Sequence, residues 1–114
     1  MLPAKFRLKI QSGKKAVWRD KKELYTPHFK MIYRAGEMDN PPKIGFIVSG
    51  KVGRAAQRNR LRRRLSEAVR SRIENFPSGI EVLVIGNKNA PEVSYEEVCT
   101  SLDRILPKIH FPGR

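Results

Sequence analysis

The stretch that decides the fold is GRAAQRNRLRRRL, Gly53 to Leu65, in which six of thirteen residues are arginine. Nothing interrupts a helix from about Arg54 to Asn75, and Pro77 and Gly79 then end it. Within this range apolar residues recur at steps of three and four, at Leu61, Leu65, Ala68, Val69 and Ile73. The spacing predicts a long amphipathic helix with one buried stripe.

The arginines are unevenly placed around this helix. At about 100° per residue, Arg60 and Arg63 lie opposite the buried stripe, whereas Arg58 and Arg62 lie almost on its line. Burial of an unpaired guanidinium costs much free energy. We therefore predict that the first turns of the helix extend beyond the sheet, with Arg58 and Arg62 reaching into open space or a groove.

Positive charge is concentrated at the start of the helix. Lys51 and Arg54 stand where the helix dipole and the free backbone N–H groups add their own positive charge. Arg54, Arg58 and Arg62 repel one another at a spacing of four residues, with no acidic residue before Glu67. Because the planar guanidinium group suits bidentate phosphate contacts, this pattern indicates a polyanionic partner.

The whole chain supports the same reading. It has 114 residues and a net charge of +13, and we expect one domain over residues 1–114. Residues 1–34 and 51–72 each carry +8, whereas residues 35–50 and 73–114 carry −1 and −2, so the partner meets two basic segments. The apolar side of the helix belongs to the core, which argues against membrane binding. No zinc-finger, basic-zipper or helix-turn-helix pattern occurs, and composition favours RNA over DNA only mildly.

Cysteine content and the N-terminus bear on the compartment. One cysteine, Cys99, allows no internal disulfide and is typical of a reducing cytosol. The first ten residues lack the apolar region of a secretory signal, and no apolar run reaches the ~18 residues of a membrane span. We therefore expect a cytoplasmic protein.

The flanking segments predict strands and two further helices. Residues 28–34 alternate, with Phe29, Met31 and Tyr33 on one face, and predict a strand. Residues 43–49 and 80–85 predict two more strands, the last one covered on both faces. Residues 14–22 predict a short helix after Ser12, and residues 94–106 predict a final helix with Ser94 and Glu97 in a capping box.

These elements predict an α+β fold, a two-layer sandwich with helices against one sheet. The loop over residues 36–42 is too short for a crossover, so the strands on either side of it are expected to pair antiparallel. The strands on either side of the long helix are expected to form a β-α-β unit of the usual right-handed kind.

The central segment also resembles a known family. KIGFIVSGKVGRAAQRNRLRRRLSEAVR, from Lys43 to Arg70, is similar to the pattern R-V-G-F-S-V-S-K-K-V-G-x-A-V-x-R-N-R-x-K-R-x-x-R-E of the bacterial ribonuclease P protein subunit. The shared positions are Gly45, Phe46, Val48, Ser49, Lys51, Val52, Gly53, Ala55, Arg58, Asn59, Arg60, Arg63 and Glu67. Residues 7–18 resemble the opening of that family, and the resemblance covers about a hundred residues.

The resemblance implies a fold and a function. The implied order is α-β-β-β-α-β-α, similar to the second domain of a small-subunit ribosomal protein, with a left-handed crossover at the long helix. The implied protein is a subunit of an endoribonuclease that removes the 5′ leader of precursor tRNA. Its RNA subunit is the catalyst and binds most of the Mg²⁺, so no catalytic residue is expected in the protein. The implied partners are ribonuclease P RNA and precursor tRNA, and the free protein is expected to be a monomer.

Candidate site residues come from the basic start of the helix and from the resemblance to the family. The candidates for contact with ribonuclease P RNA are Lys51, Arg54, Arg58, Asn59, Arg60, Arg62 and Arg63. The candidates for binding the 5′ leader are Lys14, Trp18, Lys30 and Ile32. No residue is expected to bind a metal ion directly, and Asn59 is a candidate for an indirect Mg²⁺ contact through RNA.

Several positions depart from the family pattern. Lys14 stands where the family has an aromatic residue, and Ile32 stands at a strand position that is often aromatic, with Tyr33 beside it. Gly50 replaces a lysine and Ser66 replaces an arginine. We expect leader binding to depend more on charge and less on stacking than in the family.

The sequence leaves two other functions open. One is a general RNA-binding or ribosomal structural protein, which would bind folded RNA without preferring a leader. The other is a free-standing nuclease, but the eleven acidic residues offer no pair beside the basic centre. His28 and His110 lack metal-ligand spacing, and Cys99 is expected to be a small buried group.

Overall fold

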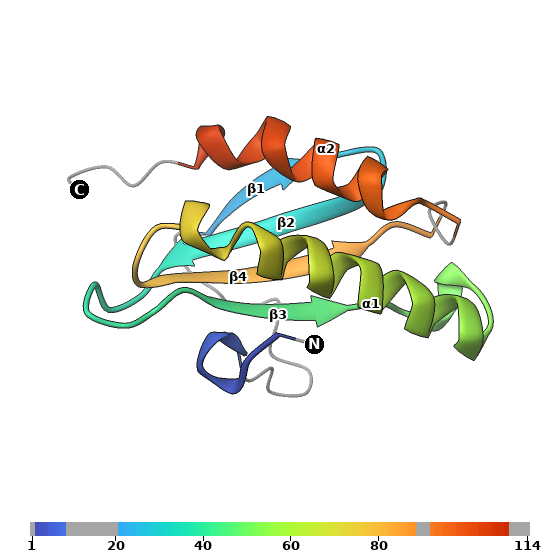
Figure 1. The fold of residues 1–114 in the computed structure, drawn as a ribbon, viewed down its shortest axis with the longest axis horizontal. Coiled ribbons are helices and arrows are strands. Elements are labelled where there is room, and N and C mark those ends of the chain that lie inside the picture. The colour runs from blue at the N-terminus through green and yellow to red at the C-terminus, as the bar shows by residue number, and fades with distance from the viewer. Residues whose placement is uncertain (1, 9–20, 89–91, 110–114) are drawn as a thin grey trace.

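The protein is one four-stranded sheet with two helices on a single face (Figure 1). This computed structural model describes residues 2–8, 21–88 and 92–109. The strands and helices are β1 (Lys22–Tyr25), β2 (Phe29–Ala35), β3 (Lys43–Ile47), α1 (Ala55–Ser71), β4 (Ile80–Gly86) and α2 (Tyr95–Ile105). Short 3₁₀ turns cover Ala4–Phe6, Gly50–Val52, Ile73–Asn75 and Leu106–Lys108. The α+β sandwich is confirmed.

The short helix predicted for residues 14–22 lies mostly outside the described residues. Its last position, Lys22, is the first residue of strand β1. Sequence patterns had not indicated this strand, because KELY is short and mostly exposed and shows no clear alternation.

The strands occur in the order β1-β2-β4-β3. The predicted antiparallel pairing of residues 28–34 with 43–49 is therefore wrong, because β4 lies between β2 and β3, antiparallel to β2 and parallel to β3. Because β4 separates them, β2 and β3 lie two strand spacings apart, about 10 Å. The seven residues that connect β2 to β3 span this distance easily. The short loop therefore predicts correctly that β2 and β3 run in opposite directions, but it does not show whether they are neighbours in the sheet.

The sheet has one apolar face and one mixed face. We call the side covered by α1 and α2 the helix face; it carries Phe29, Met31 and Tyr33 of β2, all buried in the core. The opposite side, the outer face, carries Lys30, Ile32 and Arg34 of the same strand. Charges of β2 and β4 meet there, where the Arg34 Nε donates to Glu81 Oε1 at 2.6 Å. The apolar sides of two helices can therefore pack on the helix face without burying charged groups, whereas packing on the outer face would bury them.

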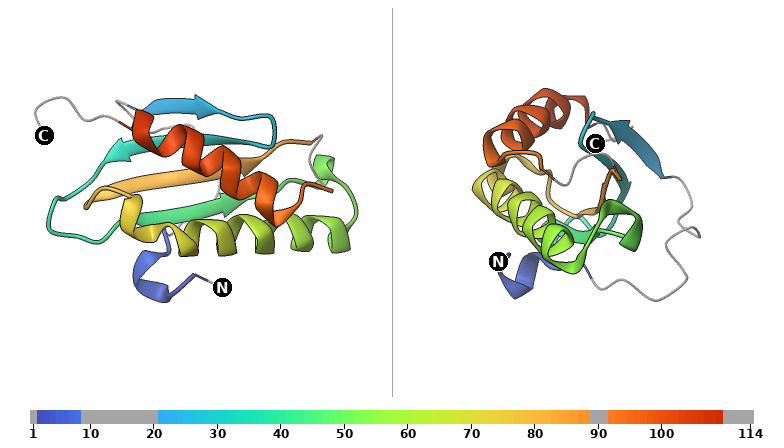
Figure 2. Two further views of the ribbon diagram at one scale, coloured as in Figure 1. Left: turned by 45° about the horizontal axis from the view of Figure 1, so that its top comes forward. Right: turned by 90° about the vertical axis from the view of Figure 1, so that its right-hand side faces the viewer.

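This difference between the faces sets the handedness of the crossover from β3 through α1 to β4. The two strands are parallel and adjacent, and both helices lie on the helix face (Figures 1 and 2). The crossover is left-handed, so the right-handed expectation from general rules is wrong and the handedness implied by the resemblance is right. A right-handed connection between the same strands would place the apolar stripe of α1 on the outer face.

Helix α1 buries the predicted stripe and ends earlier than predicted. Leu61, Leu65, Ala68 and Val69 are buried, but the helix stops at Ser71 instead of Asn75. A 3₁₀ turn follows and brings Phe76 into the core just before β4 begins. Helix α2 has the predicted capping box, in which Ser94 Oγ accepts from the Glu97 N–H at 3.1 Å and Glu97 Oε1 accepts from the Ser94 N–H at 3.2 Å.

Candidate nucleic-acid interface

The start of α1 depends on a glycine. Gly53 has φ = +151°, which disfavours any residue with a Cβ atom, and a Cβ there would collide with the side chain of Gln57. That side chain is needed where it is, because Gln57 Oε1 accepts from the Arg54 N–H at 2.9 Å. The N-cap residue is Arg54, whose side chain has no acceptor for the first-turn N–H groups. The helix therefore begins with a positive electrostatic end.

Arg58 and Arg62 occupy the positions that the stripe predicted. The first turns of α1 extend beyond the ends of the strands (Figure 1). The half-buried Arg58 folds back, and its Nη1 donates to the Gly53 carbonyl at 2.9 Å. The half-buried Arg62 donates from Nη1 to Asn59 Oδ1 at 2.9 Å and lines a pocket beside β3. Each of these two guanidinium groups therefore has a hydrogen-bond acceptor and remains partly open to solvent, so neither is buried without a partner.

The predicted RNA-contacting cations lie around the first turns of α1 and in the segment just before it, and we call this set the α1 cationic surface. Its members are Lys51, Arg54, Arg58, Arg60, Arg62 and Arg63. Among the residues that the structure describes, one carboxylate comes within ion-pair distance of this surface, Glu92 at 3.6 Å from Arg60, and both side chains are exposed. An exposed pair of this kind is weak. The surface therefore keeps nearly all of its charge for an external anion.

Asn59 is oriented by its neighbour rather than toward a metal ion. Its Oδ1 accepts from the Arg62 guanidinium, so the atom that would bind Mg²⁺ already faces a cation. The free amide N–H groups are donors, which suit phosphate or base acceptors. The residues here do not fit direct Mg²⁺ ligation.

Three other arginines of this segment have structural contacts. Arg64 donates to the Val93 carbonyl at 2.6 Å and so ties α1 to the segment before α2. Arg72 donates to both oxygens of Asp103 on α2, at 2.6 and 3.1 Å, and lowers the pKa of that carboxyl group. Arg70 pairs with Glu67 at 3.5 Å. Local charge density therefore overstates the number of arginines that are available to a partner.

Two of the four predicted leader residues, Lys30 and Ile32, are described, and they lie on the other side of the sheet. Lys30 and Ile32 are both on the outer face of β2, with Lys30 half-buried and Ile32 buried. Lys14 and Trp18 lie outside the described residues. Tyr33 points to the helix face and is only 2% exposed, so it cannot supply the ring that Ile32 lacks.

Sequence reasoning missed an aromatic residue on this face. Tyr25 of β1 pairs with Lys30 in the sheet register and is 66% exposed. The Lys30 Nζ lies 5.8 Å from the centre of the Tyr25 ring and 3.2 Å from Glu23 Oε1. The Tyr25 hydroxyl donates to Glu23 at 2.9 Å, and this bond raises the pKa of Tyr25 and lowers that of Glu23. Because the pairing of β1 and β2 creates the cluster, no local signal could have revealed it.

The remaining candidate residues are His28, Cys99 and the acidic side chains. None of them form a group of three or more His, Cys, Asp and Glu side chains that could hold a metal ion. Cys99 is buried, as predicted, and His28 lies 3.8 Å from Glu97. No helix within this part of the chain is long and apolar enough to cross a membrane.

The fold and this site define a small basic α+β protein whose most charged helix begins at an open, cationic end. Comparison with known proteins identifies the family. A family model described as Ribonuclease P matches residues 2–110, and the chain belongs to this family.

Individual relatives agree with the family match. The chain is 33% identical over 110 residues to the ribonuclease P protein component of Acidothermus cellulolyticus, covering 96% of this chain and 92% of that one. It is 30% identical to the protein component from Bacillus cereus, covering 91% and 90%. The solved ribonuclease P protein of Thermotoga maritima superimposes with a TM-score of 0.79 at 27% identity, covering 92% of this chain and 98% of that one.

Family membership fixes the coarse function. The protein is a component of ribonuclease P, a ribonucleoprotein nuclease of tRNA processing, and it partners with ribonuclease P RNA.

Proposed function

We propose that the α1 cationic surface binds ribonuclease P RNA and that the outer face of the sheet binds the 5′ leader of precursor tRNA. The observation that carries the first part is the unpaired charge of α1, where a single weak carboxylate contact offsets six cations among the described residues. A surface of this kind releases counterions when phosphates replace them, which favours binding.

The second part rests on the composition of the outer face. Lys30 supplies charge there, beside Glu23, and Tyr25 supplies an exposed ring. Ile32 is only 6% exposed and lies beneath them as part of the packing of this face. Single-stranded RNA is bound by cations that follow its backbone and by rings on which its bases stack. Lys14 and Trp18 are assigned to this site because they stand at the two aromatic positions of the family pattern, which Lys14 does not match.

In this proposal the protein contributes binding and the RNA contributes catalysis. Mg²⁺ is assigned to the RNA subunit, and Asn59 approaches it only through RNA. The protein screens repulsion between RNA segments and holds the leader, so that precursor tRNA is bound in preference to mature tRNA. The free protein is assigned as a cytoplasmic monomer.

Reconstitution tests this function. The full chain is mixed with a bacterial ribonuclease P RNA at low Mg²⁺, and removal of the 5′ leader from precursor tRNA is measured. We expect strong stimulation over RNA alone, because the protein's cations replace part of the Mg²⁺ that the RNA would otherwise need. Absence of stimulation would overturn the proposal.

Two controls separate the competing functions. The protein without RNA should not cut precursor tRNA; cleavage would indicate a free-standing nuclease. The holoenzyme should bind precursor tRNA more tightly than mature tRNA; equal affinities would indicate a general RNA-binding protein.

A further inference from the structure

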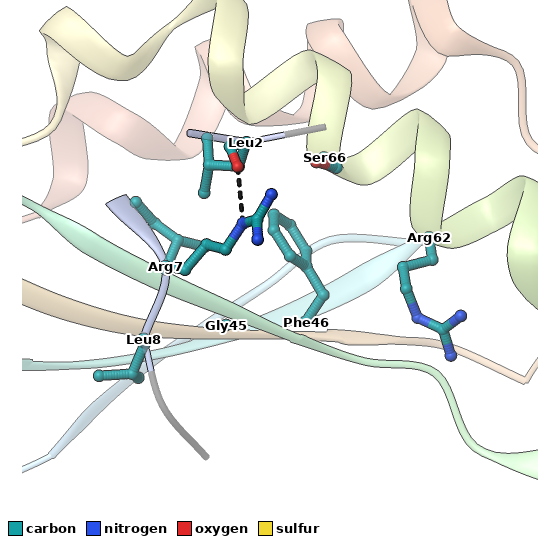
Figure 3. A pocket seen from close by; sticks show the side chains of 8 residues that line it. Leu2, Arg7, Leu8, Gly45, Phe46, Arg62 and Ser66 are labelled. Atoms are coloured by element: carbon teal, nitrogen blue, oxygen red, sulfur yellow. Dashed lines mark hydrogen bonds between the residues drawn. The ribbon is translucent and has the colours of Figure 1, made fainter. Parts of the chain in front are cut away.

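A pocket lies beside the α1 cationic surface, between three separate parts of the chain (Figure 3). Its volume is about 220 Å³, and the N-terminal segment, β3 and α1 each contribute to its walls. Arg7 approaches from the N-terminal segment, Phe46 from β3, and Arg62 and Ser66 from α1. The Arg7 Nε donates to the Leu2 carbonyl at 2.7 Å, which fixes one side of the pocket.

The lining combines an apolar floor with cations. Leu2 and Ile44 are buried, and Phe46 is half-buried against the core. The two ionisable residues in the lining are both arginines, Arg7 and Arg62, and neither forms an ion pair with any described residue. A ligand that suits these walls has a flat apolar part and a negative group.

The size of the pocket restricts that ligand. Pockets for drug-sized ligands are typically about 300–1,000 Å³, so this one admits a single ring system rather than a folded helix or a peptide segment. The pocket shares Arg62 with the α1 cationic surface, so an RNA that contacts Arg62 lies at its mouth. A nucleotide joined to that RNA has both the ring and the phosphate that the lining requires.

We infer that this pocket binds one unpaired nucleotide of the RNA that lies on α1, with the base against Phe46 and the phosphate at Arg7 and Arg62. The inference rests on the proposed RNA-binding role of α1. It adds a base-accepting site to a surface that otherwise contacts phosphates. The side chain at position 66 controls access, because a serine at this buried position leaves room that a longer side chain would fill.

The test fills the pocket without changing the charge. Ser66→Gln places a longer neutral side chain in the lining, and Ser71→Gln makes the same change at an exposed position of the same helix. Arg7→Gln removes one guanidinium group from the side of the pocket opposite α1. Thermal unfolding of each full-length variant confirms that it is folded before binding is measured.

Adenosine monophosphate is the first probe. Its binding is monitored by the NMR chemical shifts of the backbone amides of Gly45, Phe46 and Leu8. We expect saturable shifts in the wild type and in Ser71→Gln. Ser66→Gln should weaken this binding about tenfold, the scale of one lost base stack. Arg7→Gln should weaken it by about the same factor, the scale of one lost hydrogen bond to a charged group. Inorganic phosphate and adenosine, added separately, should shift these amides much less.

The second probe is ribonuclease P RNA. Ser66→Gln should bind it about tenfold more weakly than Ser71→Gln does, since one base contact is lost. If the wild type binds this RNA but adenosine monophosphate gives no saturable shift, or inorganic phosphate gives the same shift, the nucleotide pocket is refuted and the proposed function stands. If Ser66→Gln is folded and binds the RNA as tightly as Ser71→Gln, the occupant is not a nucleotide of that RNA. If the wild type fails to bind the RNA, the proposed function itself fails.

Discussion

At the scale of single residues, Gly53 both allows α1 to begin where it does and holds one of the arginines of the α1 cationic surface. Its positive φ lets the chain turn into the helix, and its carbonyl accepts from Arg58. Gly53→Ala should destabilise the protein by about 1–3 kcal/mol, because alanine resists this conformation. Urea denaturation measures the change in the free energy of unfolding.

Gly50 provides the matched control for this substitution. It lies three residues earlier, and a Cβ atom there would meet only the Arg58 side chain at an ordinary contact distance of 3.9 Å. Gly50→Ala should therefore change the free energy of unfolding by less than about 1 kcal/mol. Equal losses from the two variants would contradict the role given to Gly53.

The Arg72–Asp103 pair makes a prediction about pH. The guanidinium lowers the pKa of Asp103, so the stabilisation is present at neutral pH and is lost as the pH falls through the lowered pKa. Asp103→Asn should reduce the free energy of unfolding at pH 7 by about 0.5–1 kcal/mol, the upper range for an exposed pair. The difference from the wild type should shrink below about pH 4, where aspartate normally protonates. A difference that stays constant with pH would show that the charge of Asp103 does not matter.

At the scale of elements, the pairing of β1 with β2 places a ring on the outer face, and Tyr25→Leu tests its use. This variant should lose about tenfold in affinity for precursor tRNA in the holoenzyme and little for mature tRNA, because the lost contact is a base stack with the leader. Tyr25→Phe should keep the affinity. Equilibrium binding of both tRNA forms provides the measurement.

Tyr95 on α2 is the control for that experiment. It is also exposed, at 38%, but it lies on the helix side of the sheet and donates to Ser71 Oγ at 3.3 Å. Tyr95→Leu should leave precursor affinity unchanged. If both tyrosine variants lose affinity equally, the outer face has no special role.

The elements themselves were largely predictable. The buried stripe from Leu61 to Val69 follows from spacing within one helix, and the capping box of Ser94 and Glu97 lies within four residues of sequence. The end of α1 was not predictable in the same way. Helical pattern continues to Asn75, but the chain leaves the helix after Ser71 so that Phe76 can reach the core and β4 can enter the middle of the sheet.

The candidate site could likewise be predicted only where its residues are close together in the sequence. The charges of α1 were evident because they are consecutive in sequence. Tyr25 and Arg7 were missed because each joins its site only through tertiary contacts, Tyr25 beside Lys30 and Arg7 beside Ile44 of β3.

At the scale of the whole molecule, the sheet order and the crossover depend on which face is apolar. General rules favour a right-handed crossover, yet burial of Phe29, Met31 and Tyr33 requires both helices on their side of the sheet. Family resemblance supplied the correct hand, whereas the local patterns could not. The same arrangement separates the two proposed RNA sites, with α1 on one side of the sheet and Lys30 and Ile32 on the other.

The central claim is that the α1 cationic surface binds ribonuclease P RNA, and the salt dependence of binding tests it most directly. Affinity for this RNA is measured over a range of salt concentrations for the wild type and for a variant with Arg58, Arg60 and Arg63 changed to glutamine. A control variant loses the same charge elsewhere, at the exposed residues Lys88, Arg104 and Lys108.

Three lost phosphate contacts should reduce the log–log slope by about 2 to 3, at about 0.7–0.9 per contact, and the control should keep the slope of the wild type. A slope that is the same for the wild type and the α1 variant, or that falls equally in the control, would contradict the claim.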